Sequence, residues 1–329
     1  MKLLLELSLE CESLARAEAE SAMRALGADP KTIAEYPGVL VTEAEVDALK
    51  LSKRLGLCHY VSEWLGTCNP KDLESTARGI DLEGPIRVRS TKVGEAPAGV
   101  KLDDVSRKIG AILGGSRGVD LRSPRSDVRV IFSDKVHLGK VVGSIDRASF
   151  EKRKNRNMPF KYPISVHPKF ARALVNLTRV REHQTLLDPF CGTGAIIVEA
   201  CLVGLSSIGS DLSEKMIEGA RSNLRHIGVN AKLVKCDVGA IEQEVGHVAG
   251  IGTDPPYGRS TSTNGEAISA LYSRSFAAFA GVLTKGSRVA VVVPELELAR
   301  RRPGFRLAES HDLWVHRSLT RHFCVLERD

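Results

Sequence analysis

The chain carries the sequence TLLDPFCGTGAIIVEA at residues 185–200. Its first residues are a short apolar run that predicts a strand, and a turn rich in glycine and an apolar run typical of a helix follow. Gly192 and Gly194 allow positive φ angles and let the backbone approach a ligand closely. Strand, glycine turn and helix in this order form the nucleotide-binding unit of a doubly wound α/β sheet. We therefore expect this fold in the second half of the chain.

Four aspartates stand where short apolar runs end: Asp188, Asp211, Asp237 and Asp254. The carboxyl ends of parallel strands meet at one edge of a sheet, where open α/β sheets bind their ligands. Asp211 follows the glycine turn by about 20 residues, which is the place of an acid that binds ribose hydroxyls. These positions predict a site for a ligand that contains a ribose.

The glycine turn lacks one feature of a dinucleotide site. Ile197 stands where the third glycine of that fingerprint would be, and the fingerprint serves to bind a pyrophosphate. S-adenosylmethionine (SAM) carries a ribose but no pyrophosphate. The departure therefore favours SAM over NAD.

A second motif, GTDPPYGRS, occupies residues 252–260. An apolar run leads into it and predicts a buried strand, which ends at Asp254 because two prolines cannot donate ladder hydrogen bonds. Asp254 offers an acceptor-only carboxylate, the prolines fix the directions of the carbonyls, and Tyr257 offers a plane on which a base can stack. This combination suits an exocyclic amino group on a planar ring. The alternative is a proline-rich turn that only closes the strand.

The composition is that of an ordinary globular protein large enough for two domains: 329 residues, 43% hydrophobic and 26% charged. A net charge of +7 and a pI near 9.0 favour an anionic partner such as nucleic acid. The first residues are too short an apolar run for a signal peptide, and we expect neither a membrane span nor a zinc ligand set. Seven scattered cysteines without CxxC spacing indicate reduced thiols and a cytoplasmic protein.

The first half of the chain predicts an α+β architecture. Strand and helix patterns over residues 3–65 follow the order of a ferredoxin-like unit, and residues 85–142 predict a second small unit. In that second unit Arg87 and Arg89 alternate with apolar residues, so they would share one face. We place an N-terminal domain at 1–145, a basic linker at 146–164, and the doubly wound domain at 165–329.

These motifs resemble those of a known family. Asp188-Pro189 with Gly192 and Gly194, together with the Asp-Pro-Pro-Tyr segment at 254–257, resembles SAM-dependent amino-methyltransferases. The longer form through 258–261 is similar to the archaeal and eukaryotic tRNA guanine-10 N2-methyltransferases. Residues 85–142 resemble a THUMP domain, an RNA-binding module of tRNA-modifying enzymes, most strongly at 109–110 and 119–128; the alternative is a generic α+β domain. The resemblance implies a Rossmann-like class I methyltransferase domain behind a ferredoxin-like and THUMP RNA-binding domain.

The resemblance also implies roles for individual residues. The cofactor SAM would contact Asp188, Phe190, Gly192, Gly194, Asp211, Leu212, Asp237, Val238 and Asp254. Asp188 would position the loop and the methionine amino group, and Asp237 would bind the adenine amino group between Leu212 and Val238. The catalytic residues would be Asp254, Pro255, Pro256 and Tyr257. Asp254 and the carbonyl of Pro255 would accept the hydrogens of the guanine amine, and Tyr257 would stack on the base.

The implied function is SAM-dependent methylation of guanine 10 in tRNA at N2, with an N-terminal part that binds the 3′ acceptor end. The alternatives are a DNA or rRNA amino-methyltransferase and a non-catalytic RNA-binding scaffold. A small zinc-binding activator protein is a further partner that the family implies, and the alternative is that the chain acts alone. The sequence leaves open whether one or two methyl groups are added, and the roles of His167, Arg317 and Arg321.

Overall fold

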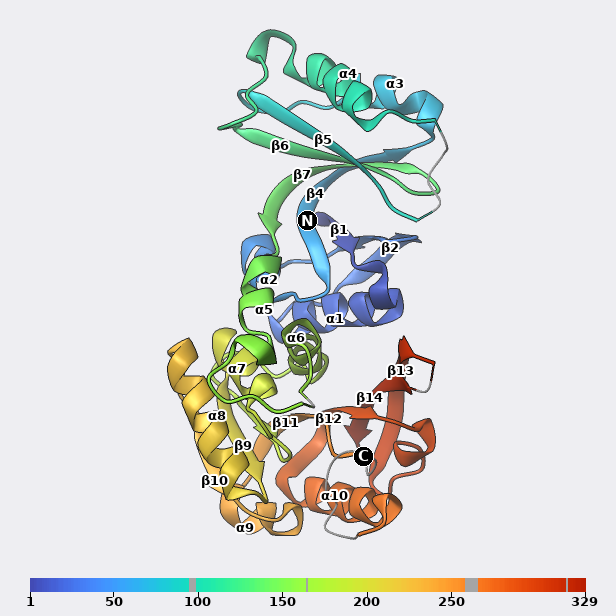
Figure 1. Ribbon diagram of the computed structural model, residues 1–329. Helices are drawn as coiled ribbons and strands as arrows, with labels where there is room; N and C mark the ends of the chain where they lie inside the picture. Colours follow the sequence, from blue (N-terminus) through green and yellow to red (C-terminus); the bar gives the residue numbers. More distant parts are fainter. Residues whose placement is uncertain (95–98, 164, 258–265, 318) are drawn as a thin grey trace. The chain divides into compact units, whose positions relative to one another are not determined.

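The computed structural model describes residues 1–94, 99–163, 165–257, 266–317 and 319–329 (Figure 1). The chain forms two compact units, each assembled from more than one segment. Unit 1 comprises Met1–Glu12, Ala28–Lys53 and Cys58–Ile145. Unit 2 comprises Ser13–Gly27, Arg54–Leu57 and Asp146–Asp329.

Unit 1 is built on one seven-stranded sheet in the order β2-β3-β1-β4-β7-β6-β5. Its strands are β1 (Lys2–Leu7), β2 (Lys31–Tyr36), β3 (Val39–Glu43), β4 (Cys58–Cys68), β5 (Ile86–Lys92), β6 (Ser126–Phe132) and β7 (Val136–Ser144). The sequence predicts two small units here, but the strands form one sheet because β4 pairs with both β1 and β7. Its helices are α2 (Ala48–Arg54), α3 (Leu73–Arg78) and α4 (Leu102–Gly114).

Helices α3 and α4 cover one face of the β5 end of this sheet (Figure 1). Ile109 and Leu113 of α4 pack there against Val88 and Val128 in one apolar cluster. Arg87 and Arg89 share a face of β5, as the alternation predicts. Both guanidinium groups pair with Asp127, at N–O distances of 2.8 and 2.6 Å. These arginines are therefore partly neutralised by the neighbouring strand.

Unit 2 contains the predicted doubly wound sheet, in the order β10-β9-β8-β11-β12-β14-β13. Its strands are β8 (Thr185–Asp188), β9 (Ser206–Asp211), β10 (Lys232–Lys235), β11 (Val248–Thr253), β12 (Leu283–Val293), β13 (Phe305–His316) and β14 (Leu319–Arg328). The strands β8 to β12 are parallel, and β14 lies antiparallel between β12 and β13. The expected Rossmann-like fold is confirmed, and it ends in the antiparallel hairpin of β13 and β14.

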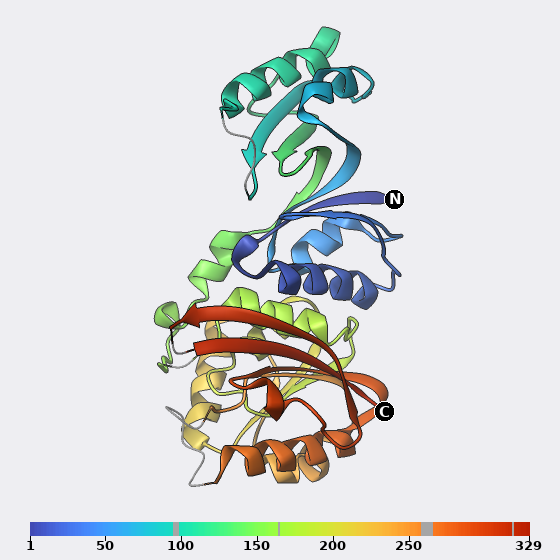
Figure 2. The ribbon, with the colours of Figure 1, turned by 90° about the vertical axis from the view of Figure 1, so that its right-hand side faces the viewer.

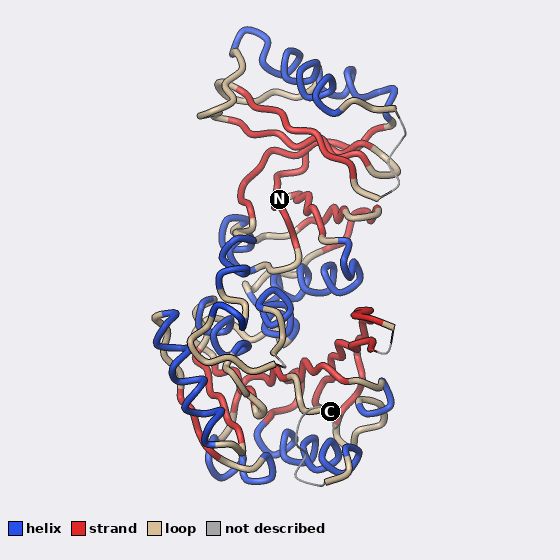
Figure 3. Tube along the Cα trace, in the orientation of Figure 1, coloured by secondary structure: helices blue, strands red, loops and turns tan. Residues whose placement is uncertain are grey.

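Helices cover both faces of this sheet, as Figures 1 and 3 show. They are α5 (Arg147–Lys152), α6 (Pro168–Leu177), α7 (Ala195–Leu202), α8 (Glu214–Ile227), α9 (Ile241–Val245) and α10 (Ile268–Val282). Tyr272, Phe276 and Phe279 of α10 pack on one face against Ile251 and Leu187. Helices α6 and α7 lie on the other face. Strands β9 and β11 flank β8 on opposite sides, so the chain changes direction at β8 and leaves a crevice at its carboxyl end.

Helix α1 (Glu12–Ala25) belongs to unit 2, although the sequence assigns residues 1–145 to one domain. Its Glu18 is fully buried and accepts hydrogen bonds from the backbone N–H of Gly56 and Leu57 and from Asn176, at 2.7, 2.8 and 2.8 Å. Burial raises the pKa of Glu18 to about 7. Arg54 Nε donates to Asn176 Oδ1 at 2.9 Å. These bonds join residues 38 to 158 positions apart, which explains why local sequence patterns did not predict them.

The segment at 146–164, predicted as a linker, also clusters with unit 2 over its described residues. Arg153, just after α5, donates to Glu199 of α7 at 2.6 Å. Arg172 of α6 pairs with the same carboxylate at 2.7 Å. The side chains of Glu199 and Arg172 are 1% and 5% exposed, so three segments of unit 2 meet at one buried negative charge.

All seven cysteines are free thiols. Cys191 lies in the glycine turn, where burial raises the pKa of its thiol well above the ordinary value. A thiol in that state is a poor nucleophile. Within the described ranges, no helix is long and apolar enough to cross a membrane.

Candidate active site

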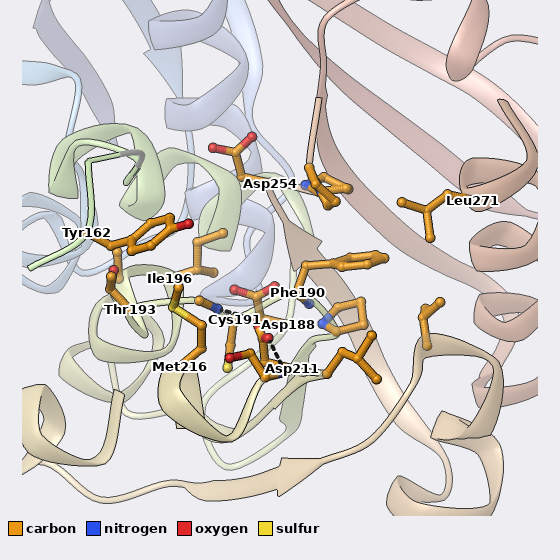
Figure 4. A pocket seen from close by; sticks show the side chains of 18 of the residues that line it. Tyr162, Asp188, Phe190, Cys191, Thr193, Ile196, Asp211, Met216, Asp254 and Leu271 are labelled. Atoms are coloured by element: carbon orange, nitrogen blue, oxygen red, sulfur yellow. Dashed lines mark hydrogen bonds between the residues drawn. The ribbon is translucent and has the colours of Figure 1, made fainter. Parts of the chain in front are cut away.

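A cavity of about 650 Å³ opens at the carboxyl ends of the parallel strands of unit 2 (Figure 4). The side chains of Asp188, Asp211 and Asp254 point toward it from β8, β9 and the loop after β11. Eleven of the predicted site residues line this cavity: Asp188, Phe190, Gly192, Asp211, Leu212, Asp237, Val238, Asp254, Pro255, Pro256 and Tyr257. The fold thus brings together side chains from four separate strand ends.

Asp188 holds the beginning of the glycine turn. Its Oδ1 accepts from the hydroxyl of Thr253 at 2.7 Å and from the backbone N–H of Phe190 at 3.2 Å. The side chain is buried, and burial raises its pKa to about 7. Asp188 ends β8 and Thr253 ends β11, so this carboxyl group links the carboxyl ends of two neighbouring strands.

The two glycines of the turn differ in their surroundings. Both have positive φ, 48° at Gly192 and 83° at Gly194. Gly192 lines the cavity and donates its N–H to Oδ2 of Asp211 at 3.0 Å. Gly194 is the N-cap of α7, and a Cβ there would lie 3.2 Å from the Cβ of Ala220. Gly194 therefore allows close packing of α7 on α8, whereas Gly192 is the glycine that lines the cavity.

Asp211 is tied to the backbone on both sides. Besides Gly192, it accepts from the N–H of Ser213 at 2.9 Å. Each carboxylate oxygen can accept more than one hydrogen bond, so both can still accept from a ligand. Burial raises the pKa of Asp211 above its ordinary value. Leu212 next to it is 49% exposed and presents an apolar side chain to the cavity.

Asp237 and Val238 form another wall. Asp237 Oδ1 accepts from the N–H of Gly239 at 2.8 Å and pairs with Arg274 of α10. Arg274 also pairs with Glu266 at 2.8 Å, and both line the cavity. Sequence reasoning missed these two residues. The available signal was a single arginine in an otherwise apolar helix, which reads equally well as a surface position.

The Asp-Pro-Pro-Tyr segment folds back on itself. The hydroxyl of Tyr257 donates to Oδ1 of Asp254 at 2.6 Å. Burial raises the pKa of Asp254, and the charge of Arg321 and the Tyr257 hydrogen bond oppose that rise. The guanidinium of Arg321, on β14, lies 5.9 Å from the centroid of the Tyr257 ring. The sequence predicts only a stacking role for Tyr257, and residues 258–261 of the longer motif lie outside the described residues.

Three residues left open by the sequence occupy different places. His167 caps α6, where its Nδ1 accepts from the N–H of Lys169 at 3.2 Å. Its Nε2 lies 3.4 Å from Glu151, and burial lowers its pKa. These contacts fit a structural role. Arg317 is exposed in the turn after β13, whereas Arg321 contacts the segment that carries Asp254.

Residues upstream of the glycine turn also line the cavity, among them Tyr162, Ser165 and Val166. Ser165 Oγ lies 3.1 Å from Thr193 Oγ1, so this segment is held against the turn. The composition of residues 146–164 predicts a basic connector or a basic path for RNA. The resemblance of the segment that begins at Pro163 to the family segment before the glycine turn implies a position beside the cofactor, and Ser165 and Val166 line the cavity.

Comparisons with known proteins agree with this geometry. Residues 153–322 match a protein family described as RMKL-like, methyltransferase domain. A tRNA (guanine(10)-N2)-dimethyltransferase of Methanothermobacter thermautotrophicus is 34% identical over 338 residues, covering 100% of both chains. One of Pyrococcus abyssi is 33% identical over 90% of this chain and 91% of its own length. The crystal structure of TrmN from Thermus thermophilus covers 100% of both chains with a TM-score of 0.56 and 23% identity, a likeness of fold.

Proposed function

This chain belongs to the family of tRNA (guanine(10)-N2)-dimethyltransferases, and from that premise we propose that it transfers methyl groups from SAM to N2 of guanine 10 in tRNA. The observation that carries the proposal is one cavity with two ends. In Figure 4, Asp211 lies at one end of the cavity beside the glycine turn and Asp254 at the other, and the prolines after Asp254 and Tyr257 also line the cavity. A nucleoside cofactor and an exocyclic amine can meet there.

The residues of the cavity fit SAM. Its volume lies within the range of small-molecule sites, and its donors and acceptors match the parts of SAM. Asp211 would accept from the ribose hydroxyls and Asp237 from the adenine amino group, while Leu212 and Val238 would pack on the ring. The glycine turn held by Asp188, with Phe190 and Gly192, would receive the methionine end. Bound SAM supplies an electrophilic methyl group, and the protein supplies its orientation.

Asp254 acts on the amine that receives the methyl. The lone pair of guanine N2 is delocalised into the ring, and a positioned acceptor for its hydrogens restores nucleophilicity and aligns it. In our proposal the Asp254 carboxylate and the Pro255 carbonyl accept one hydrogen each. After the first transfer one hydrogen remains for the second, which allows a dimethylated product. The target base must leave its helical stack to reach this position.

Tyr257 then has two tasks. Its ring would stack on the base, as the sequence predicts, and its hydroxyl fixes Oδ1 of Asp254. The fixed oxygen leaves Oδ2 as the acceptor oriented toward the substrate. The sequence could suggest the ring but not the hydrogen bond, because the bond depends on how the chain turns at Pro255 and Pro256.

The pH dependence of the rate should depend on Arg321. The groups that act on Asp254 are Arg321, Tyr257, Asp188 and Tyr272, and Arg321 is the cation among them. The ionised carboxylate is the active form, so the rate falls as pH drops through its pKa. Arg321→Gln removes the charge that lowers this pKa. We expect the acid limb of the single-turnover pH profile to move to higher pH.

The control for this prediction is Arg317→Gln, which removes the same charge from an exposed turn. It should leave the profile where it is. An Arg321→Gln profile that coincides with that of the wild type, at any absolute rate, would show that Arg321 does not act on Asp254.

Asp211→Ala should weaken SAM binding roughly 10-fold to 150-fold, the size of one lost charge-assisted hydrogen bond. The substitution also leaves the N–H groups of Gly192 and Ser213 without their acceptor, which loosens the turn. Isothermal titration calorimetry with SAM measures the change. Glu214→Ala, at an exposed carboxylate beside the site, is the matched control and should bind SAM normally. Equal affinities for the two variants would remove Asp211 from the cofactor site.

The proposal extends to the parts of the chain outside the cavity. Unit 1, which contains the segment that resembles a THUMP domain, would bind the tRNA, so the enzyme would act in the cytoplasm. Phosphate contacts release counterions, and tRNA binding should fall as salt rises. A small zinc-binding activator protein would pair with an edge strand of the second sheet, β10 or β13. Full activity of the purified single chain would make such a partner dispensable.

One experiment tests the choice of substrate atom. Purified protein and labelled SAM are incubated with an unmodified tRNA transcript and with a transcript that carries adenine at position 10, its partner base changed to keep the pair. Methyl incorporation should appear in the first and fall to background in the second. Equal incorporation into both would contradict guanine 10 as the target.

A further inference from the structure

The turn between β13 and β14 lies at the same edge of the sheet as the cavity. Strand β13 runs parallel to β12, because both pair antiparallel with β14, and β12 is in turn parallel to β11 and β8. Its carboxyl end therefore lies at the ligand-binding edge. In Figure 2 strands β13 and β14 run side by side, with the arrowhead of β13 at the left.

This hairpin extends beyond its neighbour in the sheet. The pairing between β12 and β14 ends at Val293 and His322. Pairing between β13 and β14 continues past that point, through Leu313 with Arg321 and Trp314 with Thr320. Residues 313–317 and 319–321, which we call the hairpin tip, thus lie beyond the pairing with β12.

The hairpin tip presents an indole to solvent. Trp314 is 71% exposed, the highest value among the exposed large hydrophobic side chains of the described residues, and Val315 beside it is 41% exposed. Burial of a tryptophan side chain stabilises a protein strongly because the side chain is large and apolar. At the hairpin tip Trp314 stays in solvent and adds nothing to the core. Tryptophan is enriched at interfaces, where its apolar ring is covered while its N–H keeps a polar partner, so the exposed indole indicates a contact with a ligand.

The charge of the hairpin tip selects the class of ligand. Residues 313–321 read LWVHRSLTR, with two arginines and no acid, and Asp312 just before them pairs with His322 at 2.7 Å. Arg317 is exposed in the turn. Arg321 contacts the ring of Tyr257, so the base of the tip adjoins the segment that carries Asp254. An exposed aromatic plane with a cation in the adjoining turn suits a nucleobase and its phosphate.

We propose that the hairpin tip binds the substrate RNA, with Trp314 stacked on a base next to the guanine that enters the cavity and Arg317 on the adjoining phosphate. The inference rests on the proposed RNA substrate. Turning a guanine out of its helix leaves a neighbouring base with an unstacked face. RNA-binding proteins cover such faces with aromatic side chains. Trp314 therefore stabilises the opened substrate and adds affinity that does not depend on unit 1.

Fluorescence tests this contact directly, because the chain has only two tryptophans, Trp64 and Trp314. In a Trp64→Phe background the emission comes from Trp314 alone, and stacking on a base quenches it. Titration with unmodified tRNA should quench this emission, with the same midpoint as an independent binding assay. Trp314→Ala should weaken tRNA binding about 5-fold to 150-fold, the range of one lost base–aromatic stack, and Trp314→Phe should retain most of the affinity. SAM affinity should be unchanged in both.

The control is Leu202→Ala, which truncates an exposed apolar side chain at the end of α7, 41% exposed. It should bind tRNA as the wild type does. Absence of quenching together with normal tRNA affinity of Trp314→Ala would overturn the inference. A Trp314→Ala variant that loses self-association in light scattering, while its tRNA affinity stays normal, would also overturn it and assign the tip to a protein contact. In either case the wild-type enzyme would still methylate tRNA, so the proposed function is tested separately.

Discussion

Asp254→Asn should lower the single-turnover rate of methyl transfer by roughly 100-fold to 10,000-fold, the usual effect of losing a positioned acceptor for a proton. In the structure, this substitution keeps the hydrogen bond of one carboxylate oxygen and replaces only the other oxygen. The Tyr257 hydroxyl donates to Oδ1 of Asp254, and the amide oxygen of asparagine can accept the same bond. The amide nitrogen then takes the place of Oδ2 and presents a donor to the guanine amine, which is itself a donor. SAM and tRNA affinities should change little.

Tyr257→Phe is the matched variant. It keeps the ring and removes only the hydroxyl that fixes the carboxylate, so we expect a smaller loss of rate with near-normal tRNA affinity. Tyr257→Ala removes the stacking surface as well and should also weaken tRNA binding. A near-normal single-turnover rate for Asp254→Asn would mean that the carboxylate has no catalytic role and that the segment is a structural turn.

Glu199→Ala should be the most destabilising single substitution predicted from the fold. It leaves the guanidinium groups of Arg153 and Arg172 in a buried position without their shared counter-charge. Breaking such a buried pair costs roughly 3–5 kcal/mol, which corresponds to a fall of roughly 6–20 °C in the transition of a unit of this size. Differential scanning calorimetry of the full chain measures this shift.

Two further variants show how much of this destabilisation comes from the buried charge. Glu199→Gln keeps hydrogen-bond acceptance and removes the charge, so its loss should be smaller than that of alanine. Glu218→Ala breaks an exposed pair with Arg221 on α8, where surface ion pairs contribute at most about 1 kcal/mol. A transition temperature for Glu199→Ala within the range of Glu218→Ala would show that the three segments are held by apolar packing instead.

The doubly wound sheet could be predicted because its signals are local. The apolar runs, the glycine turn and the acid at each strand end all lie within a few residues of one another, and the carboxyl ends of parallel strands must meet. The same logic brought Asp188, Asp211 and Asp254 to one cavity. It could not separate Gly192 from Gly194, since their difference depends on Ala220 of the next helix.

The features that the sequence did not predict depend on contacts between distant residues. Arg321 reaches Tyr257 from the last strand, and Arg274 reaches Asp237 from α10. Helix α1 clusters with unit 2 through Glu18, whose partners at Gly56 and Asn176 are 38 and 158 positions away. Such partners follow from the fold and leave no local pattern. For this reason a fragment that begins at residue 146 would lack part of unit 2.

Nucleoside mass spectrometry with site mapping tests the central claim most directly. Unmodified tRNA transcript is incubated with SAM and the purified full-length chain, and the digested product is followed over time. We predict N2-methylguanine at position 10, converting with time to N2,N2-dimethylguanine, with Asp254→Asn at background. Methylation of an adenine at N6, or of a guanine at another position, would contradict the account, as would a tRNA that stays unmodified although the protein binds SAM.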